Sequence, residues 1–203
     1  NKELRRIDEF ILYGIAAADE ALADANWKPE TDEDQHRTGV MIGSGIGGLG
    51  GIYETSVILH ERGPRRISPF FIPKMIADSA AGLISMRHVL RGPSYVTASA
   101  CASSNNSMID AFNYIRLGTC VAVVTGGSEA AIYESGVGGF NALHAMSTRN
   151  DDPATASRPY DKDRDGFVLG EGGAAIILED LDHAKARGAK IYAEVIGYGL
   201  SGD

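Results

Sequence analysis

Short apolar segments alternate with helix-like segments along this chain, and that alternation constrains its fold more than any other feature. The expected strands lie at residues 40–42, 95–100, 121–125, 174–178 and 191–197, and the expected helices at 8–24, 52–61, 77–90, 105–117 and 182–187. Strands that are apolar throughout belong to sheets that helices cover on both faces. The pattern therefore predicts an α/β fold, and no linker or internal repeat divides residues 1–203.

Glycine and proline indicate where several of these elements end. Gly63-Pro64 ends the second expected helix, and Gly118 and Gly188 are placed to close two later ones. Residues 31–37 are polar and acidic, which favours a loop.

Composition excludes several classes of function. The net charge of -8 argues against nucleic-acid binding, which needs a concentrated basic surface. Two cysteines are too few for a disulfide scaffold, so we expect a reducing, cytoplasmic location. A membrane partner is not expected, because no apolar run reaches the roughly 18 residues that span a bilayer.

Cys101 is the candidate nucleophile. It lies in a run of small residues, Val96-Thr97-Ala98-Ser99-Ala100-Cys101-Ala102-Ser103-Ser104, where a strand turns directly into a helix. Such a helix would direct its free N–H groups and the positive end of its dipole at a thiolate, and the turn could stabilise an oxyanion. On local chemistry alone, a buried and inert cysteine remains an equal alternative, and Cys120 is interpreted as structural.

The segment around Cys101 resembles the active-site segment of the β-ketoacyl-acyl-carrier-protein synthases, closest to the type II synthases of dissociated bacterial fatty acid synthesis. Further motifs resemble that family in order and spacing: Gly43-Ser44-Gly45-Ile46-Gly47-Gly48-Leu49-Gly50, Ile67-Ser68-Pro69-Phe70-Phe71-Ile72-Pro73, Leu90-Arg91-Gly92-Pro93-Ser94, Gly138-Gly139-Phe140, Ser157-Arg158-Pro159-Tyr160 and Arg164-Asp165-Gly166-Phe167-Val168. One small departure is Ser99, where the family usually has threonine; serine keeps the hydroxyl.

The resemblance implies an acyltransferase with a thiolase-like fold of layered helices and sheets, α-β-α-β-α, assembled as a homodimer. By position, Cys101 matches the acyl-accepting cysteine and Ile46 the side chain that gates the acyl pocket. Phe140 would line that cavity, and Phe71 would lie near its far end. The implied reaction elongates an acyl thioester with malonyl carrier protein by decarboxylative Claisen condensation, with no cofactor and no metal.

The residues that support decarboxylation in that family, two histidines and a lysine of the second half, have no match here. We therefore expect residues 1–203 to be the N-terminal half of a synthase, incomplete at both ends. The chain's own histidines are not candidates for the base. His36 and His183 are interpreted as surface residues, and His60 and His88 as helix-end residues.

Basic residues gather locally against the acidic total. Lys2, Arg5 and Arg6, and then Arg65 and Arg66, resemble the family's contacts for an acidic acyl carrier protein. An ordinary solvated surface is the alternative. His144 stands where close relatives often have a further basic residue.

Other functions stay open at this point. The turn at residues 43–48 fits the Gly-x-Gly-x-x-Gly pattern of dinucleotide-binding modules. Asp161 to Gly166 resembles the start of a calcium loop, but the twelfth position is Gly172, and a polar network of Arg158, Asp161 and Asp165 is the preferred interpretation. A ketosynthase domain of a polyketide synthase is a further alternative. So is a non-catalytic chain-length-factor-like partner, although such partners lack the cysteine.

Overall fold

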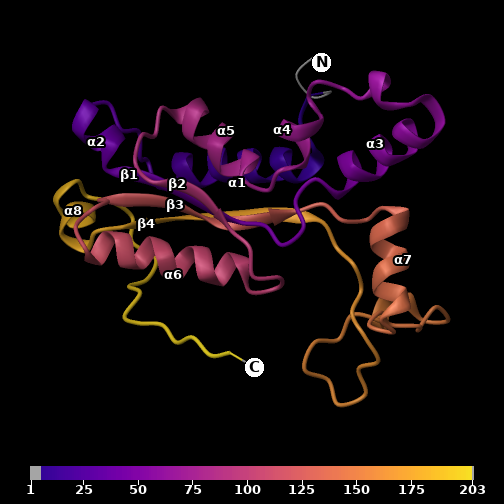
Figure 1. Cartoon of the computed structure of the whole chain (residues 1–203). Coiled ribbons are helices and arrows are strands. Elements are labelled where there is room, and N and C mark those ends of the chain that lie inside the picture. The colour runs from indigo at the N-terminus through magenta and orange to yellow at the C-terminus, as the bar shows by residue number, and fades with distance from the viewer. Residues whose placement is uncertain (1–5, 203) are drawn as a thin grey trace.

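The computed structural model describes residues 6–202 and builds them around one four-stranded sheet (Figure 1). The strands are β1 (Thr38–Gly43), β2 (Ser94–Thr97), β3 (Ala122–Glu129) and β4 (Gly172–Glu179). They lie in the order β2-β1-β3-β4. The first three strands run parallel, and β4 is antiparallel to β3. The predicted α/β class is therefore confirmed for the described residues.

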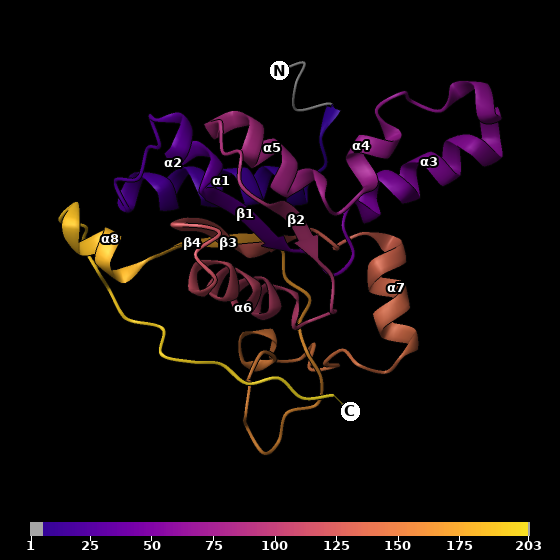
Figure 2. The ribbon, with the colours of Figure 1, turned by 60° about the vertical axis from the view of Figure 1, so that its left-hand side comes forward.

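Helices cover both faces of the sheet (Figures 1 and 2). On one face, α1 (Glu9–Asp24) and α5 (Ser79–His88) pack in one apolar cluster with Val40 and Ile42 of β1. On the other face, α6 (Ser103–Arg116) packs in a second cluster with Met41. Successive side chains of β1 thus alternate between two apolar layers, which explains why the strand is apolar throughout.

The predicted helix ends are confirmed. The helix α3 (Leu49–Arg62) stops at Gly63, whose φ of +75° is costly for other residues and which precedes Pro64. Gly118 follows α6 with a φ of +72°, and Gly188 follows α8 (Leu181–Ala186) with a φ of +69°. Each glycine therefore lets the chain leave its helix through a left-handed conformation.

Several short helices extend beyond the carboxyl ends of β1 and β3 (Figure 1). They are η2 (Pro64–Arg66), α4 (Phe71–Met75), α7 (Glu134–Ala142) and η3 (Pro153–Thr155). The sequence pattern did not indicate α4 or α7, since α4 is short and α7 is rich in glycine. Tyr53 of α3 donates a hydrogen bond to Glu134 of α7, which joins these two helices.

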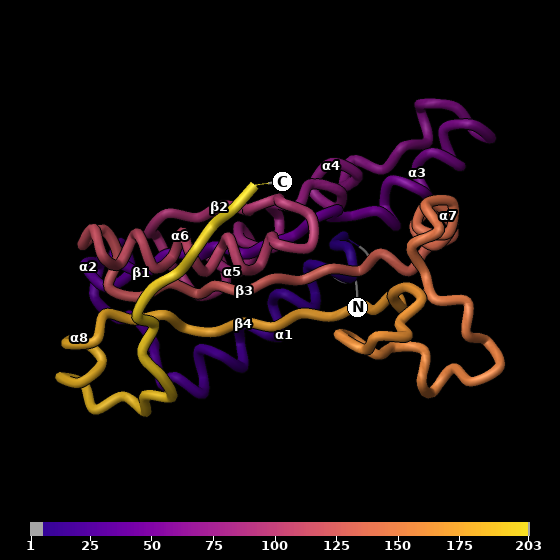
Figure 3. The backbone as a smooth tube through the Cα atoms, turned by 90° about the horizontal axis from the view of Figure 1, so that it is seen from below, coloured from indigo at the N-terminus to yellow at the C-terminus, as the bar shows by residue number. Residues whose placement is uncertain are grey.

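Two predictions were wrong. Residues 31–37 contain a short helix, α2 (Asp32–His36), because the Thr31 hydroxyl caps it by accepting a hydrogen bond from the Asp34 N–H at 3.0 Å. Residues 191–197 form no strand, since no neighbouring strand pairs with them in the described chain. The C-terminal chain crosses α6 instead (Figure 3). Just beyond this segment, the ring of Tyr198 meets that of Phe112 of α6 edge to face.

The helices of residues 6–202 are all too short or too polar to cross a lipid bilayer.

Candidate active site

Cys101 lies on a sharp turn between β2 and α6. Thr97 ends the strand and Ser103 begins the helix, so only five residues make the connection. Ala100 has a φ of +50°, a left-handed conformation that costs energy for any residue with a Cβ. The turn leaves Cys101 exposed to solvent. A strained backbone that presents an accessible thiol at a helix N-terminus is an arrangement suited to a nucleophile.

The hydroxyl of Ser103 fixes the shape of this turn. It accepts a hydrogen bond from the Ser99 N–H at 2.9 Å and donates one to the Ala100 carbonyl at 2.7 Å. The Asn106 side-chain amide donates to the Ser99 hydroxyl at 2.6 Å. Ser99 therefore supplies a hydroxyl to the turn. This was expected, because serine keeps the hydroxyl of the threonine that the family usually has at this position.

Besides the Ser99 N–H, two further N–H groups of the turn and the helix start are already engaged. The Ala102 N–H donates to the Ser99 carbonyl and the Ser103 N–H to the Ala100 carbonyl, each at 3.1 Å. The N–H of Cys101 has no hydrogen-bond partner within residues 6–202. It is therefore one donor of this turn that is available to an oxyanion, and it belongs to the candidate nucleophile itself.

The start of α6 lies unusually close to the sheet. A Cβ on Gly43 would stand 2.4 Å from the Ser103 carbonyl carbon, and one on Gly127 would stand 2.0 Å from the Ser104 hydroxyl oxygen. The glycines at the ends of β1 and β3 are thus required so that the helix N-terminus can reach the sheet edge beside Cys101.

The glycine-rich turn that follows β1 holds a carboxylate of the protein itself. Glu129, at the end of β3, accepts hydrogen bonds from the N–H groups of Gly45, Ile46 and Gly47. In a dinucleotide-binding module, such N–H groups would bind a pyrophosphate. Here they are taken by a group of the same charge, which would repel that ligand. The dinucleotide-binding alternative is therefore not supported by the geometry.

The three expected acyl-pocket residues lie on different elements at this end of the sheet. Ile46 is 39% exposed on the glycine-rich turn, and Phe71 is half-buried at the start of α4. Phe140 lies on α7, where its ring packs edge to face on Phe167 at 5.1 Å. Gly48 brings two of these elements together, since its N–H donates to the Met75 carbonyl at the end of α4.

The turn of Ile46 also abuts the turn of Cys101. A Cβ on Gly45 would lie 3.3 Å from the Ala100 carbonyl oxygen. The structure therefore brings Ile46 and Cys101 onto adjoining turns.

The expected docking residues are only partly described. Lys2 and Arg5 lie outside residues 6–202. The Arg6 guanidinium stands over the Phe70 ring, 4.8 Å from its centroid, while Arg65 and Arg66 are exposed on η2. This cation–π contact places Arg6 beside Phe70, in the segment that directly follows Arg65 and Arg66.

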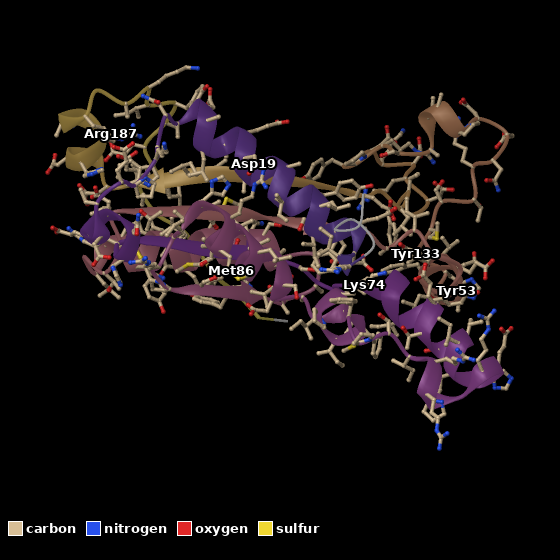
Figure 4. The ribbon with its side chains drawn as sticks, turned by 90° about the horizontal axis from the view of Figure 1, so that it is seen from above. Asp19, Tyr53, Lys74, Met86, Tyr133 and Arg187 are labelled. Atoms are coloured by element: carbon tan, nitrogen blue, oxygen red, sulfur yellow. The ribbon has the colours of Figure 1, made fainter. Side chains whose placement is uncertain are left out.

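Two of the histidines contact carboxylates of the protein itself. His88, at the end of α5, contacts the Asp19 carboxylate at 2.7 Å. His183, predicted as a surface residue, is partly exposed; it contacts Glu179 at 2.6 Å and packs on the Trp27 ring. Figure 4 shows Arg187, a further partner of Glu179, at the end of the molecule opposite Tyr53 and Tyr133.

The carboxylates of the segment that resembles a calcium loop, Asp161 to Gly166, bind groups of the protein itself. Asp165 accepts hydrogen bonds from the Ser147 hydroxyl, the Thr148 N–H and the Arg158 guanidinium. The Asp161 side chain accepts from the Asp163 N–H. These carboxylates are engaged in shaping the loop, and residues 6–202 contain no cluster suited to a metal ion. The Arg158–Asp165 part of the predicted polar network is confirmed, whereas the exposed Asp161 side chain bonds within its own turn.

Glu129 and Ser103 were missed from the sequence. Glu129 is the last residue of β3, and a carboxylate at a strand end is its one sequence signal, which does not identify its partners in the distant glycine-rich turn. Ser103 carried no such signal, because its role depends on a left-handed Ala100 that sequence does not show.

The family described as "Beta-ketoacyl synthase, N-terminal domain" matches residues 1–184. The chain is 58% identical, over 203 residues, to 3-oxoacyl-[acyl-carrier-protein] synthase 2 of Rhizobium meliloti; the match covers 100% of this chain and 48% of the relative. The chain spans about half the length of the curated relatives it matches.

Two solved structures are also similar. A beta-ketoacyl synthase from Burkholderia phymatum superposes with a TM-score of 0.87 at 35% identity, covering 97% of this chain and 48% of the other. A ketosynthase in complex with its type II polyketide acyl-carrier protein superposes with a TM-score of 0.84 at 31% identity, covering 90% and 46%. The chain therefore belongs to the beta-ketoacyl synthase family and has the thiolase-like α/β fold of its N-terminal domain.

Proposed function

We propose that this chain carries the nucleophile of a 3-oxoacyl-acyl-carrier-protein synthase, and that Cys101 is that nucleophile. The single observation that carries the proposal is the exposed thiol on a strained turn at the N-terminus of α6, in a chain 58% identical to such a synthase. The thiolate attacks the thioester of an acyl carrier protein. The acyl group moves to the Cys101 sulfur, and the carrier thiol leaves with the proton that Cys101 gave up.

The second half-reaction is condensation. Malonyl carrier protein loses carbon dioxide, and the resulting carbanion attacks the acyl–Cys101 thioester. A carbon–carbon bond forms, the bond to the Cys101 sulfur breaks, and a 3-oxoacyl carrier protein is released. The Cys101 N–H, free within residues 6–202, is placed to donate to the oxyanion formed during both attacks.

We also propose that residues 1–203 act as the nucleophile-bearing N-terminal half of this enzyme. The match of an N-terminal domain family to residues 1–184 supports this division. His88 and His183 are half-buried against the carboxylates of Asp19 and Glu179, which supports the idea that the decarboxylating histidines belong to another part of the protein.

Fatty acid elongation is favoured over polyketide synthesis by degree of similarity. Identity is 58% to the Rhizobium meliloti synthase, against 31% and 28% to two structures from polyketide and ishigamide systems. The substrates we propose are therefore acyl and malonyl carrier proteins of fatty acid biosynthesis. A cytoplasmic location is consistent with two cysteines that are both free thiols.

A carrier protein would dock on Arg6, Arg65 and Arg66, which are exposed and basic in an acidic chain. Replacement of both Arg65 and Arg66 by glutamate reverses their charge. It should raise the KM for the carrier protein and make that KM less dependent on salt concentration, with kcat unchanged. The matched control is Lys28→Glu, because the Lys28 side chain is 88% exposed and lies 3.8 Å from Glu30. An unchanged KM in the double variant would refute the docking patch.

A homodimer is proposed from the exposed edge of the sheet. Among residues 6–202, the strand β2 pairs with β1 alone, and Met86 on the adjacent α5 is 70% exposed (Figure 4). An unpaired edge beside an exposed apolar side chain favours pairing with a second copy. Met86→Glu should shift the sedimentation coefficient of the full-length protein toward that of a monomer, and an unshifted value would contradict the proposal.

The function is tested by intact mass spectrometry of the full-length protein mixed with long-chain acyl carrier protein and no malonyl partner. The wild type should gain one acyl mass, and Cys101→Ala should gain none while Cys120→Ala still gains it. If the wild type gains no mass although the carrier binds, Cys101 is not an acyl acceptor and the proposal fails.

A further inference from the structure

The carboxylate of Glu129 organises the turn that carries Ile46. Its Oε2 accepts hydrogen bonds from the Gly45 N–H at 2.7 Å and the Ile46 N–H at 3.0 Å. Its Oε1 accepts from the Gly47 N–H at 3.1 Å and from the Ser44 hydroxyl at 3.2 Å. One side chain at the end of β3 therefore satisfies four donors of a turn more than eighty residues earlier in the sequence.

We propose that Glu129 is a positioning residue for acyl-chain selection, because its carboxylate fixes the backbone from Ser44 to Gly47 and thereby the Ile46 side chain. This inference rests on the proposed function, in which Ile46 gates the acyl pocket. Glu129 acts through Ile46 and does not contact the acyl chain or the reacting atoms.

A charged carboxylate is the group that this turn requires. Three successive backbone N–H groups and a hydroxyl converge on it, so their partial positive charges sum at one point. A carboxylate offers two oxygens that only accept, whereas a glutamine amide would turn an NH₂ group toward some of the same donors. The neutral and nearly isosteric Glu129→Gln therefore loses bonds and places donor against donor.

The turn cannot move without affecting its neighbours. A Cβ on Gly45 would lie 3.2 Å from the Glu129 Oε2 and 3.3 Å from the Ala100 carbonyl oxygen. The turn is thus packed between the carboxylate and the strained backbone that precedes Cys101. On its other side, a Cβ on Gly48 would stand 2.2 Å from the Lys74 carbonyl oxygen of α4. Glu129 sets the position of Ile46 between these two fixed surfaces.

A gate held in one position discriminates among chain lengths, and a loosened gate discriminates less. The loss of one hydrogen bond changes a conformational equilibrium by about fivefold. We expect Glu129→Gln to reduce the ratio of acylation rates between the most and least favoured chain lengths by at least about fivefold, with an unchanged KM for the carrier.

The test measures Cys101 acylation rates by intact mass, using acyl carrier proteins loaded with chains of graded length and the full-length protein. Glu171→Gln is the matched control, because its Oε1 accepts a single backbone bond, from the Ile132 N–H at 2.7 Å, outside the glycine-rich turn. That variant should keep the wild-type ratio. A flattened ratio in both variants would indicate general loosening and refute the inference.

A double-mutant cycle with Ile46→Ala tests the route of the effect. If Glu129 acts through Ile46, Glu129→Gln adds no further flattening in the Ile46→Ala background; an additive effect overturns the inference. Should Glu129→Gln fail to fold, Glu129→Asp decides, since it keeps the charge with a shorter reach and should flatten the ratio partially. Failure of the wild type to acylate would overturn the proposed function, whereas acylation with an unchanged ratio in Glu129→Gln would overturn this inference alone.

Discussion

The hydroxyl of Ser103 accepts a hydrogen bond from the Ser99 N–H at 2.9 Å, across the turn that carries Cys101. The same hydroxyl donates to the Ala100 carbonyl, and Ser103 is buried. Two bonds from one side chain thus stabilise a backbone that Ala100 alone would not favour. The shape of the turn that presents the thiol therefore depends on this serine.

Ser103→Ala should therefore impair both stability and acylation. Removal of the hydroxyl leaves the Ser99 N–H unsatisfied, which we expect to lower the free energy of unfolding by about 1.5 kcal/mol. Relaxation of the turn should slow Cys101 acylation by roughly tenfold or more, since small misplacements of a reacting group are costly. Urea unfolding and intact-mass kinetics measure the two effects.

The control for that variant is Ser56→Ala. Its hydroxyl is exposed on α3 and donates to the Ile52 carbonyl at 2.8 Å, away from the turn. Wild-type acylation in Ser103→Ala would show that the turn holds its shape without the hydroxyl.

The two cysteines should differ sharply in reactivity. Cys101 is exposed, whereas Cys120 is buried and burial raises the pKa of its thiol to about 11. Iodoacetamide at pH 8 should therefore modify Cys101 in the native protein and reach Cys120 only after unfolding. Peptide mass mapping of native and urea-treated samples checks this, and native labelling of Cys120 would contradict its assignment as structural.

The raised pKa of Cys120 also has a consequence for alkaline stability. A thiol that is held neutral in the folded state contributes stability below its usual pKa of 9.0, because both states are then protonated. That contribution is lost between pH 9 and about 11, as the unfolded state alone ionises. Cys120→Ala should lose less stability over that interval than the wild type does.

Glu179 should control stability on the acidic side. Burial alone would raise the pKa of this carboxyl, but hydrogen bonds from Arg187 and His183 outweigh burial and lower it. Its stabilising contribution is therefore present above its usual pKa of 4.5 and is lost as the pH falls through the lowered value. Glu179→Gln should cost about 3 kcal/mol at pH 7, because it leaves Arg187 without its buried partner.

The difference between wild type and Glu179→Gln should shrink below pH 4.5, as the wild-type carboxyl takes up its proton. Thermal unfolding across a pH series measures it. Glu33→Gln is the control, since that carboxylate is exposed and lies 3.8 Å from Arg37. A gap that is independent of pH would exclude ionisation of Glu179 as its cause.

The predictable parts of this structure are those that local chemistry determines. The strand β1 could be located because Val40, Met41 and Ile42 are apolar on both faces, and Gly63 and Gly118 could be read as helix ends. The failures have a common cause in tertiary context. Residues 191–197 carry a strand-like sequence, but a strand needs a neighbour and the described chain supplies none.

The candidate site divides in the same way. Cys101 could be singled out from its small neighbours and the helix that follows. Glu129 could not, because its partners from Ser44 to Gly47 are distant in the sequence and only the parallel pairing of β1 with β3 brings them together. The resemblance to a family supplied Ile46, Phe71 and Phe140, whose positions on three elements no local pattern would have joined.

The last prediction concerns the close approach of α6 to the sheet. In Gly43→Ala, the added Cβ would stand 2.4 Å from the Ser103 carbonyl carbon and 2.5 Å from the Ser104 nitrogen. Both atoms belong to the backbone, so the helix N-terminus must move away from β1 and carry the Cys101 turn with it. We expect a loss of about 3 kcal/mol in the free energy of unfolding and a severe loss of acylation.

Gly138→Ala is the matched substitution, because a Cβ there meets nothing within 4 Å and alanine favours the helix α7 by about 0.5–1 kcal/mol. Urea unfolding and acylation kinetics of both variants make the comparison. Equal stability of the two alanine variants would show that the start of α6 can shift freely, and the close packing would then not be what positions Cys101.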